Sequence, residues 1–81
     1  MGSLDRELLE GEPLTPREIE VLYWAAEGDT AGETAARLWL AEETVRGYRK
    51  KITRKLRGKN LPHAVAIALR SGILSSEQET A

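Results

Sequence analysis

The 81-residue chain has no cysteine and no phenylalanine, and it contains only one histidine, two tryptophans and two tyrosines. Without cysteine it can form neither a disulfide framework nor a thiolate metal site, and a lone His63 has no second ligand or base beside it. No apolar run approaches the roughly 20 residues that span a bilayer, and the acidic start is unlike a signal peptide. We therefore expect a soluble, cytoplasmic domain that is not an enzyme and has no metal site or cofactor.

The charges of the chain are unevenly distributed. Twelve Lys and Arg against thirteen Asp and Glu give a formal net charge of −1, yet eight of the twelve basic residues lie in residues 46–59, which contain no acidic residue. A run of like charge often marks an interaction surface, although Lys and Arg are also good helix formers on a solvated face. The acidic remainder would orient the molecule so that only one surface approaches a polyanion.

Helix signals dominate the sequence, and no segment has the alternation of a strand. Thr15 with Glu18, and Thr30 with Glu33, each have the spacing of a capping box at a helix start. Glycines are expected to end the first, third and fourth helices, at Gly28, Gly58 and Gly72 respectively. The four predicted helices cover about residues 16–27, 31–38, 42–57 and 62–71. The predicted fold class is all-α.

The third predicted helix has two contrasting faces at about 100° per residue. Its apolar side is formed by Val45, Tyr48, Ile52 and Leu56. Its basic side is formed by Arg46, Lys50, Arg54 and Arg57. A short helix, a tight turn and a longer basic helix form the arrangement of a helix-turn-helix DNA reader, whose second helix enters the major groove.

Residues 14–74 resemble the LuxR-type (GerE/NarL-like) helix-turn-helix DNA-binding domain. The resemblance rests on "LTPRE", "VL", "AEG", "TV", the "I..KL" of Ile52, Lys55 and Leu56, and "AVAIAL" followed by Gly72, all in order and without an insertion. It implies a four-helix domain of a bacterial, sequence-specific transcriptional regulator located at the nucleoid. Residues 1–13 are then expected to be a flexible acidic arm, and residues 75–81 a disordered tail. No sensing domain fits before residue 14, so the chain is expected to be a stand-alone effector or a C-terminal fragment.

The resemblance also implies site residues and partners. Base edges of double-stranded DNA would be read by Arg46, Gly47 and Lys50. Phosphates would be bound by Thr15, Thr30, Thr44 and Lys55. Arg54, on the basic side of the third helix, is also expected to bind DNA. A two-fold dimer contact would involve Ala66, Ile67 and Arg70 of the fourth helix. The expected protein partners are a second copy or a heterologous regulator, with RNA polymerase as a further candidate.

Several positions depart from the family pattern. Trp39 replaces the glycine of the turn, Ala41 replaces the Ser or Thr that caps the third helix, and Ala31 and Gly32 replace a basic or amide pair. We expect Trp24 in the core and Trp39 packed in the core or turn, with an exposed patch as the alternative for Trp39. Two other functions stay open: a protein-interaction module with weak DNA binding, and a promoter reader like region four of sigma factors, which the helix after the basic helix argues against.

Overall fold

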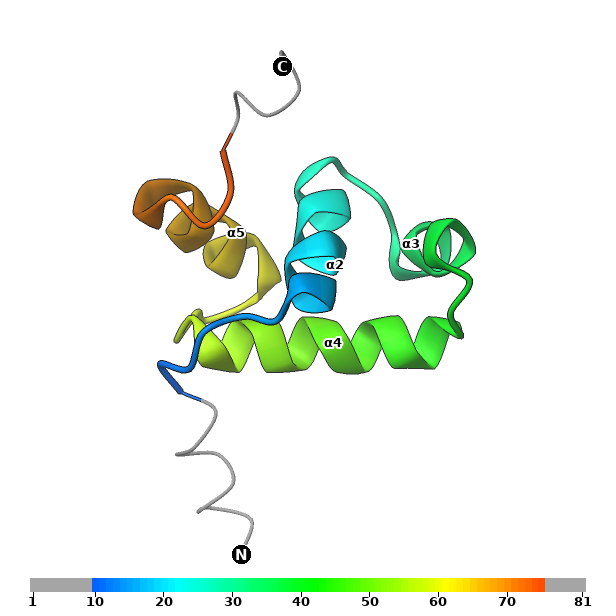
Figure 1. Cartoon of the computed structure of the whole chain (residues 1–81), viewed down its shortest axis with the longest axis horizontal. Helices are drawn as coiled ribbons and strands as arrows, with labels where there is room; N and C mark the ends of the chain where they lie inside the picture. The colour runs from blue at the N-terminus through cyan, green and yellow to red at the C-terminus, as the bar shows by residue number, and fades with distance from the viewer. Residues whose placement is uncertain (1–9, 76–81) are drawn as a thin grey trace, which may run out of the picture.

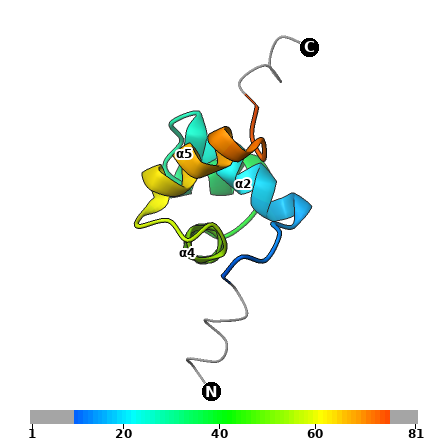
Figure 2. The same ribbon diagram turned by 90° about the vertical axis from the view of Figure 1, so that its left-hand side faces the viewer.

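The computed structural model describes residues 10–75, and within them every regular element is a helix. The helices are α2 (Pro16–Ala26), α3 (Ala31–Leu38), α4 (Glu42–Lys55) and α5 (Leu61–Ser71), each within two residues of its predicted bounds. α4 lies along one side of the molecule, and α2, α3 and α5 all lie on the other side of it (Figure 1). The view along α4 in Figure 2 shows the same separation for α2 and α5. The all-α, four-helix fold is therefore confirmed.

The chain before α2 is described only from residue 10 onward. The N–H of Gly11 donates a hydrogen bond to the carbonyl oxygen of Lys55 at 2.9 Å, and Lys55 Nζ donates to the carbonyl oxygen of Pro13 at 3.2 Å. Residues 10–13 thus lie against the end of α4. The rest of the expected arm and residues 76–81 of the expected tail lie outside the described residues. None of the helices in residues 10–75 is long and apolar enough to cross a membrane.

Both predicted capping boxes are present. Thr15 Oγ1 accepts from the N–H of Glu18 at 3.2 Å, while the N–H of Thr15 donates to Glu18 Oε1 at 2.8 Å. The corresponding bonds between Thr30 and Glu33 are 3.1 and 2.8 Å long. These reciprocal bonds satisfy backbone donors that would otherwise lack a partner at a helix start. They fix where α2 and α3 begin.

The other two helices start differently. Ala41 precedes α4 and supplies no side-chain cap, as expected for a residue without a polar side-chain atom. At α5, Asn60 Oδ1 accepts from the N–H of His63 at 2.9 Å, and His63 Nδ1 accepts from the N–H of Lys59 at 2.9 Å. The lone histidine is therefore part of the cap of α5.

The core is built from small and branched aliphatic side chains contributed by all four helices and by the segment after α5. Its buried members are Val21, Leu22, Ala31, Ala35, Val45, Ile52, Ala68 and Leu74. Tyr48 and Leu56 pack against this core while only partly buried. The predicted apolar side of α4 is therefore the side that faces the other helices.

Trp24 is not part of the core, contrary to prediction. Its side chain is only partly buried, the Tyr23 ring packs edge-on against it at 4.9 Å between centroids, and the guanidinium of Arg37 lies 3.9 Å above the indole. The core consists of alanines and branched aliphatic side chains and does not enclose the large indole ring of Trp24. The ring instead lies at the surface beneath a cation.

The end of α4 is made by Arg57 rather than by Gly58. Arg57 has φ of +59°, and the N–H of Gly58 donates to the carbonyl of Thr53 at 2.9 Å, as in a Schellman motif. Gly58 is needed for another reason: a Cβ there would lie 3.0 Å from the backbone nitrogen of Ala64. The glycine therefore permits the close approach of α5 to the end of α4.

Trp39 lies in the turn between α3 and α4 with φ of +60° and ψ of +43°, and its side chain is 93% exposed. The expectation that it packs in the core or turn is wrong, and the exposed alternative is correct. A residue with a Cβ in the left-handed region costs about 1–2 kcal/mol. The turn therefore keeps the geometry of a glycine while bearing a large side chain.

Replacing Trp39 by glycine should raise the free energy of unfolding by about 0.5–1 kcal/mol, because backbone strain is relieved and almost no packing is lost. Trp39→Ala is the matched control, since alanine keeps the Cβ and hence the strain. Urea unfolding of the two variants measures the difference. A Trp39→Gly protein less stable than Trp39→Ala would show that the turn is not strained.

Candidate nucleic-acid interface

The solvent side of α4 and the residues after it carry most of the basic residues of the chain. Six of the eight Lys and Arg in residues 46–59 are exposed: Arg46, Lys50, Lys51, Arg54, Arg57 and Lys59. Since Val45 and Ile52 of α4 are fully buried, the first four of these cations project from a helix that is anchored on its other side, while Arg57 and Lys59 follow its end. Within residues 10–75, no carboxylate forms an ion pair with Lys50, Lys51 or Arg54. This set of six cations is hereafter the cationic face.

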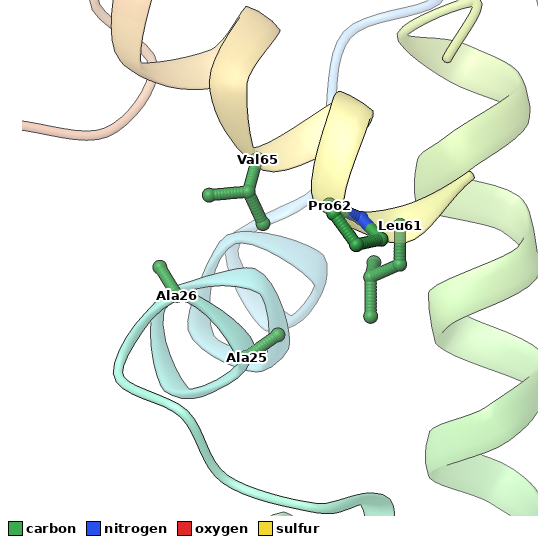
Figure 3. A pocket seen from close by; sticks show the side chains of 5 residues that line it. All are labelled: Ala25, Ala26, Leu61, Pro62 and Val65. Atoms are coloured by element: carbon green, nitrogen blue, oxygen red, sulfur yellow. The ribbon is translucent and has the colours of Figure 1, made fainter. Parts of the chain in front are cut away.

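A hollow of about 250 Å³ lies between α2 and α5 and is lined by Ala25, Ala26, Leu61, Pro62 and Val65 (Figure 3). A second hollow, of about 230 Å³, lies on α4 itself and is lined by Thr44, Gly47, Tyr48 and Lys51. A Cβ at Gly47 would meet nothing within 4 Å. The missing side chain of Gly47 therefore leaves a notch in the middle of the basic helix. At this notch a ligand can come close to the helix backbone.

Arg46 is the one member of the cationic face that has a carboxylate partner among the described residues. Its Nη2 is paired with Oε2 of Glu42, one helical turn earlier. Both side chains are at least half exposed, and exposed pairs of this kind typically contribute about 0–1 kcal/mol. The guanidinium is therefore free to form additional hydrogen bonds.

Lys55 does not belong to the cationic face, and its prediction as a phosphate contact is corrected. The residue is 8% exposed, and Nζ donates to Glu18 Oε1 at 2.8 Å and to the carbonyl of Pro13 at 3.2 Å. Lys55 follows Ile52 by three residues and Tyr48 by seven, so helical spacing already places it on the buried side of α4. The "I..KL" lysine thus joins α4 to the start of α2.

The pKa of Glu18 reflects this buried pair. Burial raises the pKa, but the hydrogen bond from Lys55, the hydrogen bonds with Thr15 and the charge of Lys55 together outweigh it, so the pKa of Glu18 is lowered from its ordinary value of 4.5. The folded protein therefore favours the ionised form of the Glu18 carboxylate more strongly than the unfolded chain does.

Stability should decrease in acid because the unfolded chain binds the Glu18 proton more readily than the folded one. The contribution is complete above pH 4.5 and is lost as the pH falls below 4.5 through the lowered pKa of the folded state. Urea unfolding from about pH 7 to about pH 3 should show a steeper decrease for the native chain than for Glu18→Gln. Parallel curves would rule out Glu18 as a source of the acid sensitivity.

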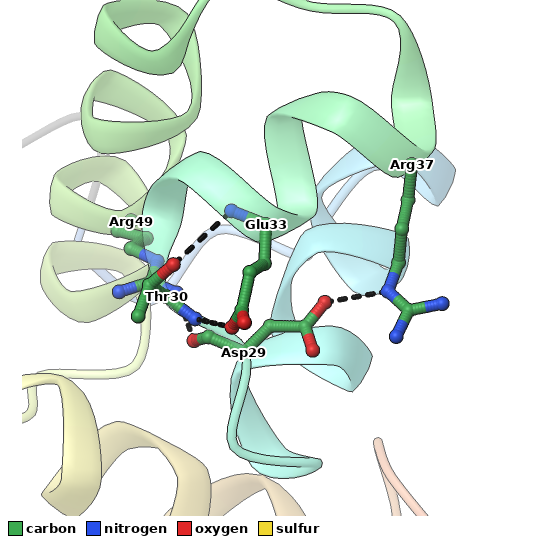
Figure 4. Close-up of polar contacts among 5 residues, drawn as sticks. All are labelled: Asp29, Thr30, Glu33, Arg37 and Arg49. Atoms are coloured by element: carbon green, nitrogen blue, oxygen red, sulfur yellow. Dashed lines mark hydrogen bonds and ion pairs between the residues drawn. The ribbon is translucent and has the colours of Figure 1, made fainter.

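A polar network joins the turn before α3 to α4 (Figure 4). Arg49 donates to the carbonyl oxygen of Asp29 at 2.8 Å, and Nε of Arg37 donates to the carboxylate of Asp29 at 2.7 Å. The sequence alone did not single out Arg49. Its spacing, four residues after Val45 and three before Ile52, places it at the edge of the buried side, where it fixes α3 against α4.

The predicted threonines occupy two kinds of position. Thr15 and Thr30 are exposed, and their hydroxyl oxygens accept the capping hydrogen bonds. Thr44 is exposed on α4 beside the notch. At the start of α3, the N–H groups of Ala31 and Gly32 have no partner among the described residues, and such groups suit a phosphate oxygen. The structure thus presents Thr30 and Thr44 from the two helices of the helix-turn-helix.

The predicted dimer residues lie on α5, apart from the cationic face. Ala66 and Ile67 are partly buried and Arg70 is exposed, whereas Ala64 and Ala68 of the same helix are fully buried. Leu69, which the sequence did not single out, is 45% exposed. The outer side of α5 therefore presents a mixed apolar and basic surface.

Comparison with known proteins agrees with this geometry. Residues 12–68 match the family described as "Bacterial regulatory proteins, luxR family". The chain is 46% identical over 63 residues to the transcriptional activator protein AhyR of Aeromonas hydrophila, covering 78% of this chain and 24% of that protein. It is 46% identical over 61 residues to the HTH-type quorum sensing-dependent transcriptional regulator RpaR of Rhodopseudomonas palustris, covering 75% and 25%.

The chain is also 48% identical over 61 residues to the HTH-type quorum sensing-dependent transcriptional regulator VjbR of Brucella abortus, and these residues cover 75% of this chain and 24% of that protein. The chain thus spans about a quarter of the length of these curated relatives. The matched residues include all of α2, α3 and α4 and most of α5. With four helices in this order and a basic helix facing solvent, the chain belongs to the luxR family of bacterial regulatory proteins and carries its helix-turn-helix DNA-binding domain.

Proposed function

We propose that the protein regulates transcription by binding specific double-stranded DNA sites with α4 in the major groove. The observation that carries this proposal is that α4 buries Val45 and Ile52 on one side and exposes four members of the cationic face on the other. A polyanion is attracted to cations that nearby carboxylates do not neutralise. The family consists of regulatory proteins, and we propose no enzymatic activity for this chain. The location that suits DNA binding is the nucleoid in the cytoplasm.

Residue roles follow from position and chemistry. Arg46 and Lys50 can donate to O6 and N7 of guanine, and the notch at Gly47 lets the helix backbone approach the base edges. Thr44 and Arg54 flank these positions and would bind phosphates, which set the register of the protein on the duplex. Thr30 and Thr15, at the starts of α3 and α2, would contact the phosphates farther from α4.

Selection of bound duplexes from a random-sequence pool tests this function. The expected result is enrichment of one short motif, and recovery of that motif as an inverted repeat would indicate two-fold binding. The native chain is compared with an Arg46→Ala/Lys50→Ala variant, which should lose the enrichment while keeping its helicity. A pool that shows no enrichment with the native chain would refute sequence-specific binding.

We also propose that two copies bind paired half-sites through α5, with Ala66, Ile67 and Arg70 in the contact. Ile67→Asp should weaken binding to a paired site about 100-fold, at the lower end of the gain that linkage provides, and leave binding to a single half-site unchanged. Because Ile67 is partly buried, helicity must be checked by circular dichroism.

Leu69→Asp is the matched control for Ile67→Asp, since it introduces the same charge at the exposed leucine of the same helix. It should have little effect on paired-site binding. If Leu69→Asp impairs paired binding and Ile67→Asp does not, the dimer contact lies on the other flank of α5.

A second candidate function is a protein-interaction module with weak DNA binding. The 93% exposed Trp39 and the apolar hollow between α2 and α5 favour it, because both offer apolar surface to a protein partner such as a heterologous regulator or RNA polymerase. The luxR family match over residues 12–68 argues against the sigma-factor reading. Selection without enrichment, together with a folded protein, is the outcome that the module predicts.

A further inference from the structure

We propose that Glu42 is a positioning residue that holds the guanidinium of Arg46 in the orientation in which it reads a base. The inference rests on the proposed function and adds a determinant of its specificity. Glu42 lies in the first turn of α4, and its Oε2 is paired with Nη2 of Arg46. An acidic residue four positions before a basic one is the favourable order for such a pair on a helix.

The other oxygen of this carboxylate lies beside the start of α3. A Cβ placed on Gly32 would lie only 3.2 Å from Glu42 Oε1, so the absence of a side chain at position 32 leaves room for the carboxylate. Gly32 is in the first turn of α3, where the positive end of the helix dipole favours a carboxylate. The carboxylate of Glu42 therefore lies between the start of α3 and Arg46.

The pair contributes little in water but more in a DNA groove. Both side chains are at least half exposed in the free protein, and attraction between charges strengthens as solvent is removed. Arginine has five N–H donors, so a guanidinium held at Nη2 keeps enough of them for a bidentate contact with guanine. The carboxylate also repels nearby phosphates. Glu42 should therefore lower overall affinity for DNA while raising discrimination between bases.

Removing the charge of Glu42 should therefore change overall affinity and base discrimination in opposite directions. Affinities of the native chain, Glu42→Gln and Glu43→Gln are measured at one salt concentration for three duplexes: the site recovered by selection, the same site with the base opposite Arg46 changed, and a scrambled sequence of equal length. Glu43 is the matched control because it is exposed in the same helical turn and forms no ion pair within residues 10–75. Removing either negative charge should tighten binding to the scrambled duplex.

Only Glu42→Gln should also reduce the preference for the selected base, by about 5-fold or more, a loss within the range of one bidentate base contact. Combining Glu42→Gln with Arg46→Ala should reduce the preference no further than Arg46→Ala alone, because Glu42 acts through Arg46. Melting temperatures check that all variants are folded.

An unchanged base preference in Glu42→Gln would overturn the proposal, since Glu42 would then only repel DNA. An additive loss in the double variant would also overturn it, because Glu42 would act independently of Arg46. If the native chain selects no site at all, the proposed function itself fails, an outcome that is distinct from both.

Discussion

Glu18→Gln is expected to lower the free energy of unfolding by about 3–5 kcal/mol, because it leaves the buried ammonium of Lys55 without its carboxylate. Glu18 and Lys55 are 3% and 8% exposed, and their charged atoms lie 2.8 Å apart. Glutamine can still accept from the N–H of Thr15, so the capping box is kept. At about 4–8 °C per kcal/mol for a domain of this size, the melting temperature should fall by at least about 12 °C.

Glu20→Gln is the matched control on the same helix. Glu20 pairs with Arg17 at 3.1 Å, but both side chains are about half exposed, so its loss should cost less than about 1 kcal/mol. The double variant Glu18→Leu/Lys55→Met should recover much of the loss, since an apolar pair of similar volume can replace a buried ion pair. Equal effects of Glu18→Gln and Glu20→Gln on urea unfolding would contradict the structural role of the buried pair.

Lys51→Ala/Arg54→Ala is expected to reduce affinity for duplex DNA of any sequence by about 60-fold at about 0.1 M salt, because both cations are expected to lie against phosphates. Each phosphate contact adds about −0.9 to the slope of log affinity against log salt. Between 1 M and about 0.1 M salt, one such contact therefore raises affinity about 8-fold, and two raise it about 60-fold. Both residues are exposed, and neither forms an ion pair with a carboxylate of residues 10–75. Fluorescence anisotropy with a scrambled duplex measures the loss.

Arg37→Ala is the control for these substitutions. It removes an exposed cation of α3 that already has the carboxylate of Asp29 as a partner at 2.7 Å. It should change DNA affinity by less than about 3-fold, because it removes no phosphate contact. If Arg37→Ala weakens binding as much as Lys51→Ala/Arg54→Ala does, the loss reflects net charge rather than contacts made by the cationic face.

Local sequence signals predicted most of the fold. The capping boxes of Thr15 and Thr30 set the starts of two helices, and the apolar spacing of Val45 and Ile52 identified the buried side of α4. What the sequence did not reveal depends on contacts between helices. The left-handed residue that ends α4 is Arg57 and not its glycine neighbour, because the glycine is required for close packing against α5.

The candidate site was predicted less completely for the same reason. The family resemblance predicts Lys55 as a phosphate contact, but Lys55 is paired with Glu18, a partner 37 residues earlier in the chain. The exposure of Trp39 likewise depends on how the turn between α3 and α4 is oriented, which propensity does not determine. The roles of Arg46, Gly47, Lys50, Thr44 and Arg54 stay predictions, which their exposed positions on α4 support.

The salt dependence of DNA binding tests most directly whether the cationic face of α4 contacts a duplex. Affinity of the native chain for a scrambled duplex is measured over a range of salt concentrations. If at least four of the six cations of the cationic face each neutralise one phosphate of the scrambled duplex, the slope of log affinity against log salt should be about −3.6 or steeper. A slope near zero, or binding too weak to measure at the lowest salt, would contradict the assignment of α4 as the DNA-binding helix.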